Sequence, residues 1–287
     1  MSIGVLLYAH NNSDIDYVKQ AIFCASRIKR FLGLQVSLVT SSVDYAKGII
    51  TDEIDNIIEV ELPKSNNSKT FRDGLYAQKK LLWNNSGRAM CYDLSPYEQT
   101  IVMDTDFIVN SKNLLKCFSS GKDLLINKDW IDVKHDRITS MKHITDTGVA
   151  MYWATVFYFT KSTKNKILFD LILHIQENYD FYRLKYKIVE AKFRNDFAFS
   201  IALHILNGFS PLEDISIPGN LWQTLDKDIL MDMQDKCYGN MNGKWHLPAC
   251  TELLFLLEKN SEYYPAKIKD TDIHIMNKYS LERCTNV

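Results

Sequence analysis

The sequence predicts an α/β fold in which a mostly parallel sheet is flanked by helices. The first observation is the near-continuous apolar run IGVLLYA at residues 3–9, which is typical of a strand buried on both faces. A polar capping cluster follows it, and apolar residues then recur at helical spacing from Ile15 to Leu32. Short apolar strands at 36–40 and 57–62 come next. Strands that alternate with amphipathic helices indicate βαβ units and hence parallel pairing.

The rest of the chain continues this alternation and then becomes irregular. Further strands are expected over residues 100–103, 123–127 and 148–159, the last as a strand or hairpin, and helices over 71–83, 164–178 and 195–207. The polar stretch 128–147 has no clear period and is expected to be a loop over a site. The irregular C-terminal third is expected to hold a strand at 215–218, an apolar helix at 251–259 and a final apolar segment at 272–276. Neither repeats nor linkers interrupt the sequence, which predicts one domain over residues 1–287.

Bulk properties narrow the class of protein. The formal net charge of −1 argues against a generally basic nucleic-acid binder, although a local basic patch is compatible with it. The longest apolar run, at 149–159, is shorter than the ~18 residues that a membrane helix needs, so we expect no membrane span. The start of the chain resembles no signal peptide, and the six cysteines form no CxxC pair. These features predict a cytoplasmic protein with reduced thiols.

Two aspartates in the stretch TIVMDTDFIV, residues 100–109, are the strongest functional signal. Asp104 ends an apolar strand, and Asp106 points to the same side because side chains alternate along an extended chain. Ligands of parallel α/β sheets bind beyond the carboxyl ends of the strands. Two like charges this close repel, so either the strand has reached the surface or a cation lies between them. Paired carboxylates suit Mn²⁺ or Mg²⁺, while a solvated turn is the alternative.

The segment SPYEQTIVMDTDFIVNSKNL, residues 95–114, resembles the metal-binding segment of GT-A-fold nucleotide-sugar glycosyltransferases, most of all the glycogenin-like group. The chain is also similar to small glycosyltransferases encoded by phages, for which the location would be the host cytoplasm. This resemblance implies a Rossmann-like GT-A domain over residues 1–287. It also implies transfer from a nucleoside-diphosphate sugar, in the UDP form for this group, to a hydroxyl acceptor with retention of configuration.

Several other segments resemble that family in the same order along the chain. VLLYAHNN at 5–12 and VTSSVD at 39–44 resemble the nucleotide-contacting loops, and residues 71–88 resemble the helix that closes over the donor. DTGVAMYWATVFYF at 146–159 resembles the strand behind the donor sugar. The resemblance implies donor contacts from Tyr8, Ala9, His10, Arg88, Thr105, Asp146, Thr147 and Lys278.

The segment DIHIMNKYS, residues 272–280, resembles the family's histidine-containing motif. The resemblance makes His274 the third metal ligand beside Asp104 and Asp106, and Lys278 a contact of the diphosphate. The family's usual glycine and Lys-Pro-Trp are absent here, with Asn277, Lys278 and Tyr279 in their place. A histidine packed at a strand end is therefore the alternative interpretation of His274.

Two further segments concern the acceptor side. A polar stripe on the helix at 195–207 begins with Asp196, and the resemblance places this carboxylate near the sugar and the attacking hydroxyl, as a catalytic group beside Asp104 and Asp106. A solvated helix face is the alternative. The stretch FYRLKYKIVEAKFR at 181–194 interleaves five basic residues with aromatics. It is either a solvated face or the lining of a cleft for a phosphate-bearing acceptor such as nucleic acid.

These observations predict a metal-dependent glycosyltransferase whose acceptor is a glycan, a protein, a small molecule or a modified nucleic acid. A nucleotidyl- or phosphotransferase with a D-x-D metal site is the first alternative, but the chain has no Gly-rich phosphate loop after its first strand. The second alternative is a non-catalytic binding module in which the aspartate pair is only a turn.

Overall fold

A six-stranded sheet forms the core of the protein. The computed structural model describes residues 2–50, 52–61, 67–84, 87–134, 142–236 and 250–285. The sheet has the order β3-β2-β1-β6-β10-β8, and its strands are β1 (Ile3–Ala9), β2 (Gln35–Thr40), β3 (Asn56–Glu59), β6 (Gln99–Asp104), β8 (Leu124–Asn127) and β10 (Trp153–Thr160). The pairs β3–β2, β2–β1 and β1–β6 are parallel, and β10 runs antiparallel to both of its neighbours. The predicted mostly parallel α/β sheet is confirmed.

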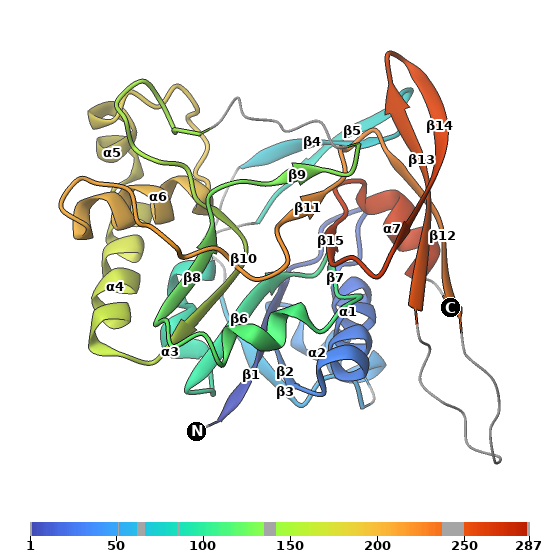
Figure 1. Ribbon diagram of the computed structural model, residues 1–287, viewed down its shortest axis with the longest axis horizontal. Coiled ribbons are helices and arrows are strands. Elements are labelled where there is room, and N and C mark those ends of the chain that lie inside the picture. The colour runs from blue at the N-terminus through green and yellow to red at the C-terminus, as the bar shows by residue number, and fades with distance from the viewer. Residues whose placement is uncertain are drawn as a thin grey trace.

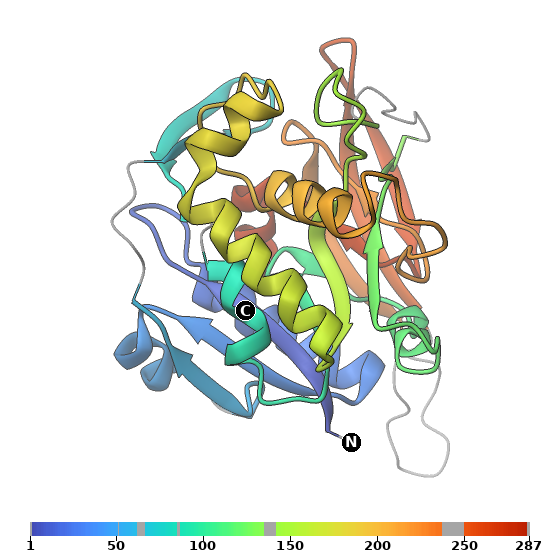
Figure 2. The same ribbon diagram turned by 90° about the vertical axis from the view of Figure 1, so that its left-hand side faces the viewer.

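Helices cover both sides of this sheet. The helices α4, at the left in Figure 1, and α1, at the right, lie on opposite sides of the central strands, and α4 crosses in front of the sheet in Figure 2. The helices are α1 (Tyr17–Leu32), α2 (Val43–Ile49), α3 (Cys91–Leu94), α4 (Thr163–Glu177), α5 (Tyr179–Lys185), α6 (Asn195–Leu206) and α7 (Lys278–Thr285), with 3₁₀ turns η1 (Gly87–Met90) and η2 (Asn113–Cys117). Among the described residues, the helices are all too short or too polar to cross a membrane.

The helix α1 shows why these segments fold as the sequence predicts. The carboxylate of Asp16 caps its first turn by accepting a hydrogen bond from the backbone nitrogen of Lys19 at 3.0 Å. Its buried residues Val18, Ala21, Ala25 and Ile28 recur at helical spacing and pack against the sheet. Gly33 ends the helix with φ 65°, a left-handed conformation that glycine adopts without steric cost.

A second, four-stranded sheet brings the end of the chain to the aspartate pair. Its order is β7-β15-β11-β9, and its strands are β7 (Phe107–Ile108), β9 (Ile131–Asp132), β11 (Trp222–Gln223) and β15 (Ile273–His274). His274 pairs with Phe107, and the backbone nitrogen of Ile275 donates to the carbonyl of Asp106 at 2.9 Å. The carboxylate of Asp272 accepts hydrogen bonds from the backbone nitrogens of Asn110 and Ser111 at 2.7 and 2.8 Å. These contacts place His274 beside the D-x-D segment.

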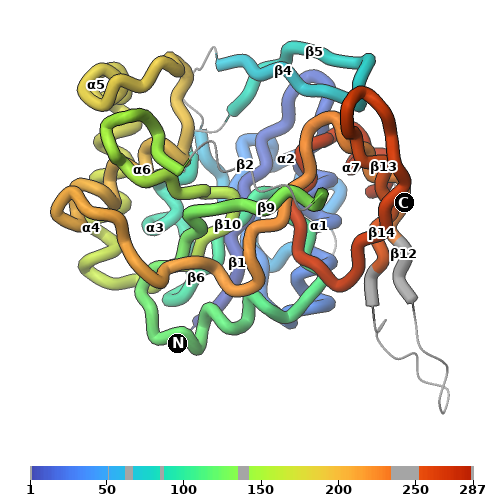
Figure 3. Tube along the Cα trace, turned by 45° about the horizontal axis from the view of Figure 1, so that its top comes forward, coloured from blue at the N-terminus to red at the C-terminus, as the bar shows by residue number. Residues whose placement is uncertain are grey.

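The predicted helix over residues 71–83 is wrong. The segment forms a hairpin of β4 (Ser68–Asp73) and β5 (Ala77–Leu82), whose turn contains Gly74 at φ 73°. Phe71 and Leu81 bury their side chains in a small cluster with Ile15, while the flanking polar residues lie at the surface or line a cavity. The tip of this hairpin lies beside β13–β14 (Figure 3), where the backbone nitrogen of Leu75 donates to the Tyr263 hydroxyl at 2.8 Å.

The C-terminal third is more regular than predicted. It contains an antiparallel sheet of β12 (Ile229–Lys236), β13 (Cys250–Lys259) and β14 (Glu262–Lys269), so the predicted helix at 251–259 is wrong. Leu253, Phe255 and Leu257 are buried, whereas the residues between them are partly exposed, which is the period of a strand. No strand forms at 215–218, and the loop predicted at 128–147 holds β9, although residues 135–141 lie outside the described part.

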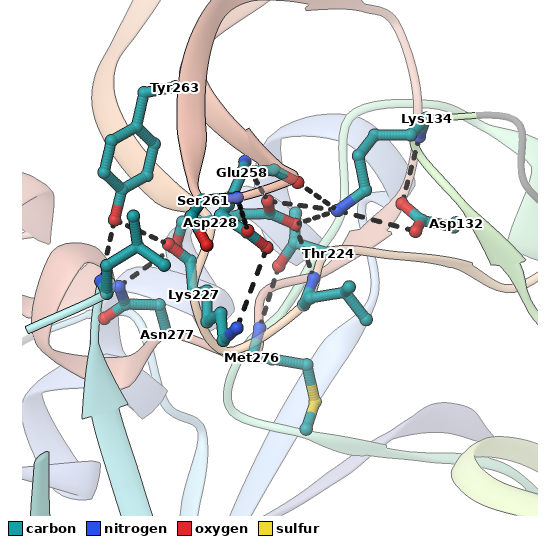
Figure 4. Close-up of polar contacts among 12 residues, drawn as sticks. Asp132, Lys134, Thr224, Lys227, Asp228, Glu258, Ser261, Tyr263, Met276 and Asn277 are labelled. Carbon is teal, nitrogen blue, oxygen red and sulfur yellow. Dashed lines mark hydrogen bonds and ion pairs between the residues drawn. The ribbon is translucent and has the colours of Figure 1, made fainter.

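A buried acidic residue, Asp228, joins this C-terminal sheet to the second sheet (Figure 4). Its carboxylate accepts hydrogen bonds from the backbone nitrogens of Leu225 and Glu258 at 2.6 and 2.8 Å. The ammonium of Lys134 lies 3.3 Å from the same carboxylate. Next to this turn, the hydroxyl of Thr224 accepts a hydrogen bond from the backbone nitrogen of Met276 at 3.0 Å. The network therefore fixes the segment that follows His274.

We expect Asp228→Ala to lower the free energy of unfolding by about 3–5 kcal/mol, because it leaves two buried backbone nitrogens without an acceptor and Lys134 with Asp132 as its remaining ion-pair partner. Urea unfolding followed by circular dichroism measures this change. The matched control is Asp170→Ala, which removes the exposed ion pair with Lys166 on α4 and should change stability little. Equal stability of the two variants would contradict the role of Asp228.

Candidate active site

A cavity of about 380 Å³ opens at the carboxyl ends of β1 and β6. This is the edge at which ligands of parallel α/β sheets bind. Tyr8 and His10 enter it from the end of β1, and Asp104, Thr105 and Asp106 from the end of β6. The rest of the wall comes from the β4–β5 hairpin, η1, β10, the segment before α6, β11 and the end of the chain, and includes Lys69, Phe71, Trp83, Arg88, Trp153, Thr155, Glu190, Lys192, Arg194, Asp196, Gln223, His274 and Lys278.

Three potential metal ligands meet on one wall of this cavity. One ligand atom each from Asp104, Asp106 and His274 lies within 4.8 Å of the others. The Nε2 atom of His274 lies 3.4 Å from a carboxylate oxygen of Asp106 and 4.0 Å from one of Asp104. The Asp106 side chain is buried, while that of Asp104 is 26% exposed, so the group is open to the cavity on one side. An open face of this kind leaves room for a substrate oxygen on a bound ion.

The hydrogen bonds of His274 orient it as a metal ligand. Its Nδ1 lies 2.9 Å from the amide oxygen of Gln223, which can only accept, so Nδ1 carries the proton and the Nε2 lone pair faces the two carboxylates. Burial, together with the charges of Lys69 and Arg88, lowers the pKa of His274 to about 3, which keeps the ring neutral. Three electron-rich atoms that face one another fit a divalent cation, for which carboxylate and imidazole are suitable ligands.

Two buried cations neutralise the carboxylates. Arg88 forms an ion pair with Asp104, and Lys278 forms one with Asp106. Asn277 caps α7 by accepting from the backbone nitrogen of Ser280 at 3.0 Å, which places Lys278 at the first turn of that helix. Burial lowers the pKa of the Lys278 ammonium well below its usual range. The cluster therefore sets two carboxylates and two cations side by side at the cavity floor.

Asp196 lines the same cavity from the first turn of α6. One carboxylate oxygen accepts a hydrogen bond from the backbone nitrogen of Ala154 at 2.9 Å, and the other lies 2.8 Å from an Arg194 nitrogen. Further along the helix, the Ser200 hydroxyl is fully buried and donates to the Asp196 carbonyl at 2.7 Å. Asp196 therefore joins α6 to β10, and the start of the predicted polar stripe is not a solvated helix face.

Two polar atoms at the end of β1 lack partners among the described residues. The Tyr8 hydroxyl and the Nε2 atom of His10 are both buried without a hydrogen bond, and both side chains line the cavity. Burial raises the pKa of Tyr8 well above its usual range and lowers that of His10 to about 4. Buried polar groups are almost always paired, so these atoms point to a polar ligand. The backbone of Gly87 lies close to the Tyr8 ring, because a Cβ at position 87 would be only 3.1 Å from that ring.

The structure does not bring every predicted site residue to the cavity. Ala9 is fully buried in the core, and Asp146 and Thr147 are exposed outside the cavity lining. The Thr147 hydroxyl instead bonds the Thr145 hydroxyl at 2.7 Å. Side chains that the sequence did not single out take part in the lining: Lys69, Trp83, Thr155, Glu190 and Gln223. None of these five residues carried a usable sequence signal, because their places in the lining depend on how tertiary packing arranges the strands and loops that hold them.

Comparison with known proteins adds similarities of structure but none of sequence. Neither the scan against protein-family models nor the search of curated proteins returned a match. The solved structures similar to this chain include glycosyltransferases. The galactosyltransferase LgtC, in complex with donor and acceptor sugar analogs, matches at a TM-score of 0.43 and 13% identity over 69% of this chain and 70% of its own. The glycosyltransferase GlyE of Streptococcus pneumoniae TIGR4 matches at 0.39 and 14% over 78% of this chain and 46% of its own.

A third similar structure belongs to another class of enzyme. The 4-diphosphocytidyl-2C-methyl-D-erythritol synthase of Anaerococcus prevotii DSM 20548 matches at a TM-score of 0.34 and 14% identity, over 78% of this chain and 88% of its own.

We expect Gln223→Leu to weaken Mn²⁺ binding by about 10–100-fold, because His274 then loses the acceptor that fixes its tautomer and orientation. Electron paramagnetic resonance of free Mn²⁺ during titration measures this affinity. Gln78→Leu, at an exposed position on β5, is the matched control and should bind Mn²⁺ as the native protein does. An unchanged affinity in the Gln223 variant would contradict the role of Gln223 in orienting the histidine as a ligand.

Proposed function

We propose that the protein is a metal-dependent glycosyltransferase that moves a sugar from a nucleoside-diphosphate sugar, with UDP as the nucleotide, to a hydroxyl acceptor. The observation that carries this proposal is the group of Asp104, Asp106 and neutral His274 at the carboxyl end of β6. Two cations, Arg88 and Lys278, lie against the same carboxylates. This combination suits a metal ion and a diphosphate that bind together.

The chemistry that these residues support is electrostatic. A bound Mn²⁺ or Mg²⁺, held by Asp104, Asp106 and His274, would supply positive charge to the diphosphate as it leaves the sugar. Once their carboxylates face a cation, Arg88 and Lys278 are free to donate charge-assisted hydrogen bonds to diphosphate oxygens. Burial strengthens each of these interactions, because the local dielectric constant is lower than that of water.

The neighbouring groups suit the remaining parts of the donor. The unpaired hydroxyl of Tyr8 and the Nε2 atom of His10 offer hydrogen bonds to the base or the ribose. Thr105 lies between the two aspartates on the cavity wall, and we assign it as the uncharged donor contact of the D-x-D segment. Asp196 lies on the acceptor side in this proposal, where its carboxylate orients a sugar hydroxyl or the attacking hydroxyl of the acceptor.

Titration with UDP tests the site. The native protein should bind UDP more tightly with Mn²⁺ than without it, by isothermal titration calorimetry. In the Asp104→Asn/Asp106→Asn variant, Mn²⁺ should no longer raise the affinity for UDP, because the ion loses two of its three protein ligands. The control Asp129→Asn/Asp170→Asn removes two exposed carboxylates outside the cavity lining and should keep the Mn²⁺ effect. Retention of that effect in the Asp104/Asp106 variant would exclude the proposed site.

A donor screen distinguishes the proposal from its alternatives. A glycosyltransferase should slowly release free sugar and UDP from one nucleotide sugar when water replaces the acceptor, and this release should require Mn²⁺ or Mg²⁺. A nucleotidyltransferase would instead release pyrophosphate from a nucleoside triphosphate. A binding module would bind nucleotide without releasing either product. Pyrophosphate release without sugar release would therefore contradict the proposal.

A further inference from the structure

The basic side chains of the cavity outnumber its acidic ones. Five lysines and arginines line it, against four aspartates and glutamates. Three of the cations form ion pairs within the lining, namely Arg88 with Asp104, Lys278 with Asp106 and Arg194 with Asp196. This pairing leaves two lysines, Lys69 and Lys192, and one acid, Glu190.

Lys69 reaches the cavity from the β4–β5 hairpin and is surrounded by aromatic rings. Its ammonium lies 5.3 Å from the centre of the Trp83 ring and 5.8 Å from that of Phe71. No carboxylate of the described residues forms an ion pair with it. Burial and the charge of Arg194 lower the pKa of this ammonium. A cation in such surroundings gains free energy when an anion binds beside it.

Lys192 reaches the cavity from another part of the chain, the segment between α5 and α6. Its backbone nitrogen donates a hydrogen bond to the Glu190 carboxylate at 3.2 Å, so one oxygen of that acid is bound by the backbone of its own segment. The Lys192 ammonium has no ion pair within the described residues. Lys185 and Lys187 of the same basic stretch are exposed and lie outside the cavity lining. Of the five basic residues of this stretch, Lys192 and Arg194 line the cavity.

The proposed donor does not account for these two lysines. The two charges of the diphosphate are matched by those of Arg88 and Lys278, and the charges of Asp104 and Asp106 by that of the divalent ion. Arg194 and Asp196 already form a pair. After metal and diphosphate are bound, the lining keeps one net positive charge, because the charges of Lys69 and Lys192 exceed that of Glu190 by one, and a further negative group on a substrate would balance it.

We propose that Lys69 and Lys192 form a second anion subsite in this cavity, which takes a carboxylate or phosphate group that a substrate carries in addition to the diphosphate. This inference rests on the proposed function. The group has two possible sources, the sugar of the donor or the acceptor, and both present the same chemistry to the lysines. Phe71 and Trp83 would pack against the apolar face of the molecule that carries the anion.

Calorimetric titrations with Mn²⁺ test the subsite with defined probes. For a donor source, the native protein should bind UDP-glucuronate at least about tenfold more tightly than UDP-glucose, since the two differ by one carboxylate. For an acceptor source, the native protein saturated with UDP and Mn²⁺ should bind glucose 6-phosphate or inorganic phosphate. It should bind neutral glucose at least about tenfold less tightly than either anion. In Lys69→Gln/Lys192→Gln the preference for the anionic probe should disappear, while Mn²⁺ should still raise the affinity for UDP.

The matched control is Lys185→Gln/Lys187→Gln, which removes two charges of the same basic stretch outside the cavity and should keep the native preference. An Mn²⁺-dependent gain in UDP affinity in both variants shows that the fold and the metal site are intact. If the native protein prefers none of the anionic probes, or if the Lys69/Lys192 variant keeps the preference, the subsite is overturned. Failure of the native protein to bind UDP with Mn²⁺ would instead overturn the proposed function.

Discussion

The pairing of β7 with β15 is the constraint on which the site depends. Two short strands, one directly after the D-x-D segment and one near the end of the chain, pair antiparallel with His274 opposite Phe107. The Ile275 nitrogen donates to the carbonyl of Asp106, so the backbone itself fixes the histidine beside that aspartate. Without this pairing the two carboxylates would form a turn at the end of β6, and the cavity would lack its only nitrogen ligand within the described cluster. A contact between residues more than 160 positions apart therefore creates the candidate metal centre.

Charge compensation explains how acidic and basic groups coexist at this buried place. Isolated carboxylates at the floor of a cavity would be costly, and Arg88 and Lys278 offset that cost by pairing with them. The same cations are the groups that a diphosphate needs, so an exchange of partners on substrate binding keeps the charges of Arg88, Lys278, Asp104 and Asp106 matched. Gln223 and the Asp228 network hold the histidine segment, and Asp196 holds the start of α6 against β10. Each metal ligand and Asp196 thus have a structural partner that fixes their position.

The sequence predicted those parts of the site that depend on local pattern. The apolar run before Asp104 and the period of two between the aspartates indicated a carboxylate pair at a strand end, and the structure confirms their position at the end of β6. His274 could be assigned only by resemblance, because its neighbour Asp106 is distant in the sequence. The β4–β5 hairpin was mistaken for a helix, since its apolar residues Phe71, Leu75, Leu81 and Leu82 do not alternate strictly. Lys69 and Gln223 therefore had no sequence signal, because their roles depend on where tertiary packing places their strands.

The most direct test of the central claim is anomalous diffraction at the manganese edge from crystals grown with Mn²⁺ and UDP. The account predicts one anomalous peak bounded by Asp104, Asp106 and the Nε2 atom of His274, with Arg88 and Lys278 turned from their carboxylates towards the diphosphate. A map in which UDP is bound but no peak lies among these three residues, with both ion pairs still in place, would contradict it.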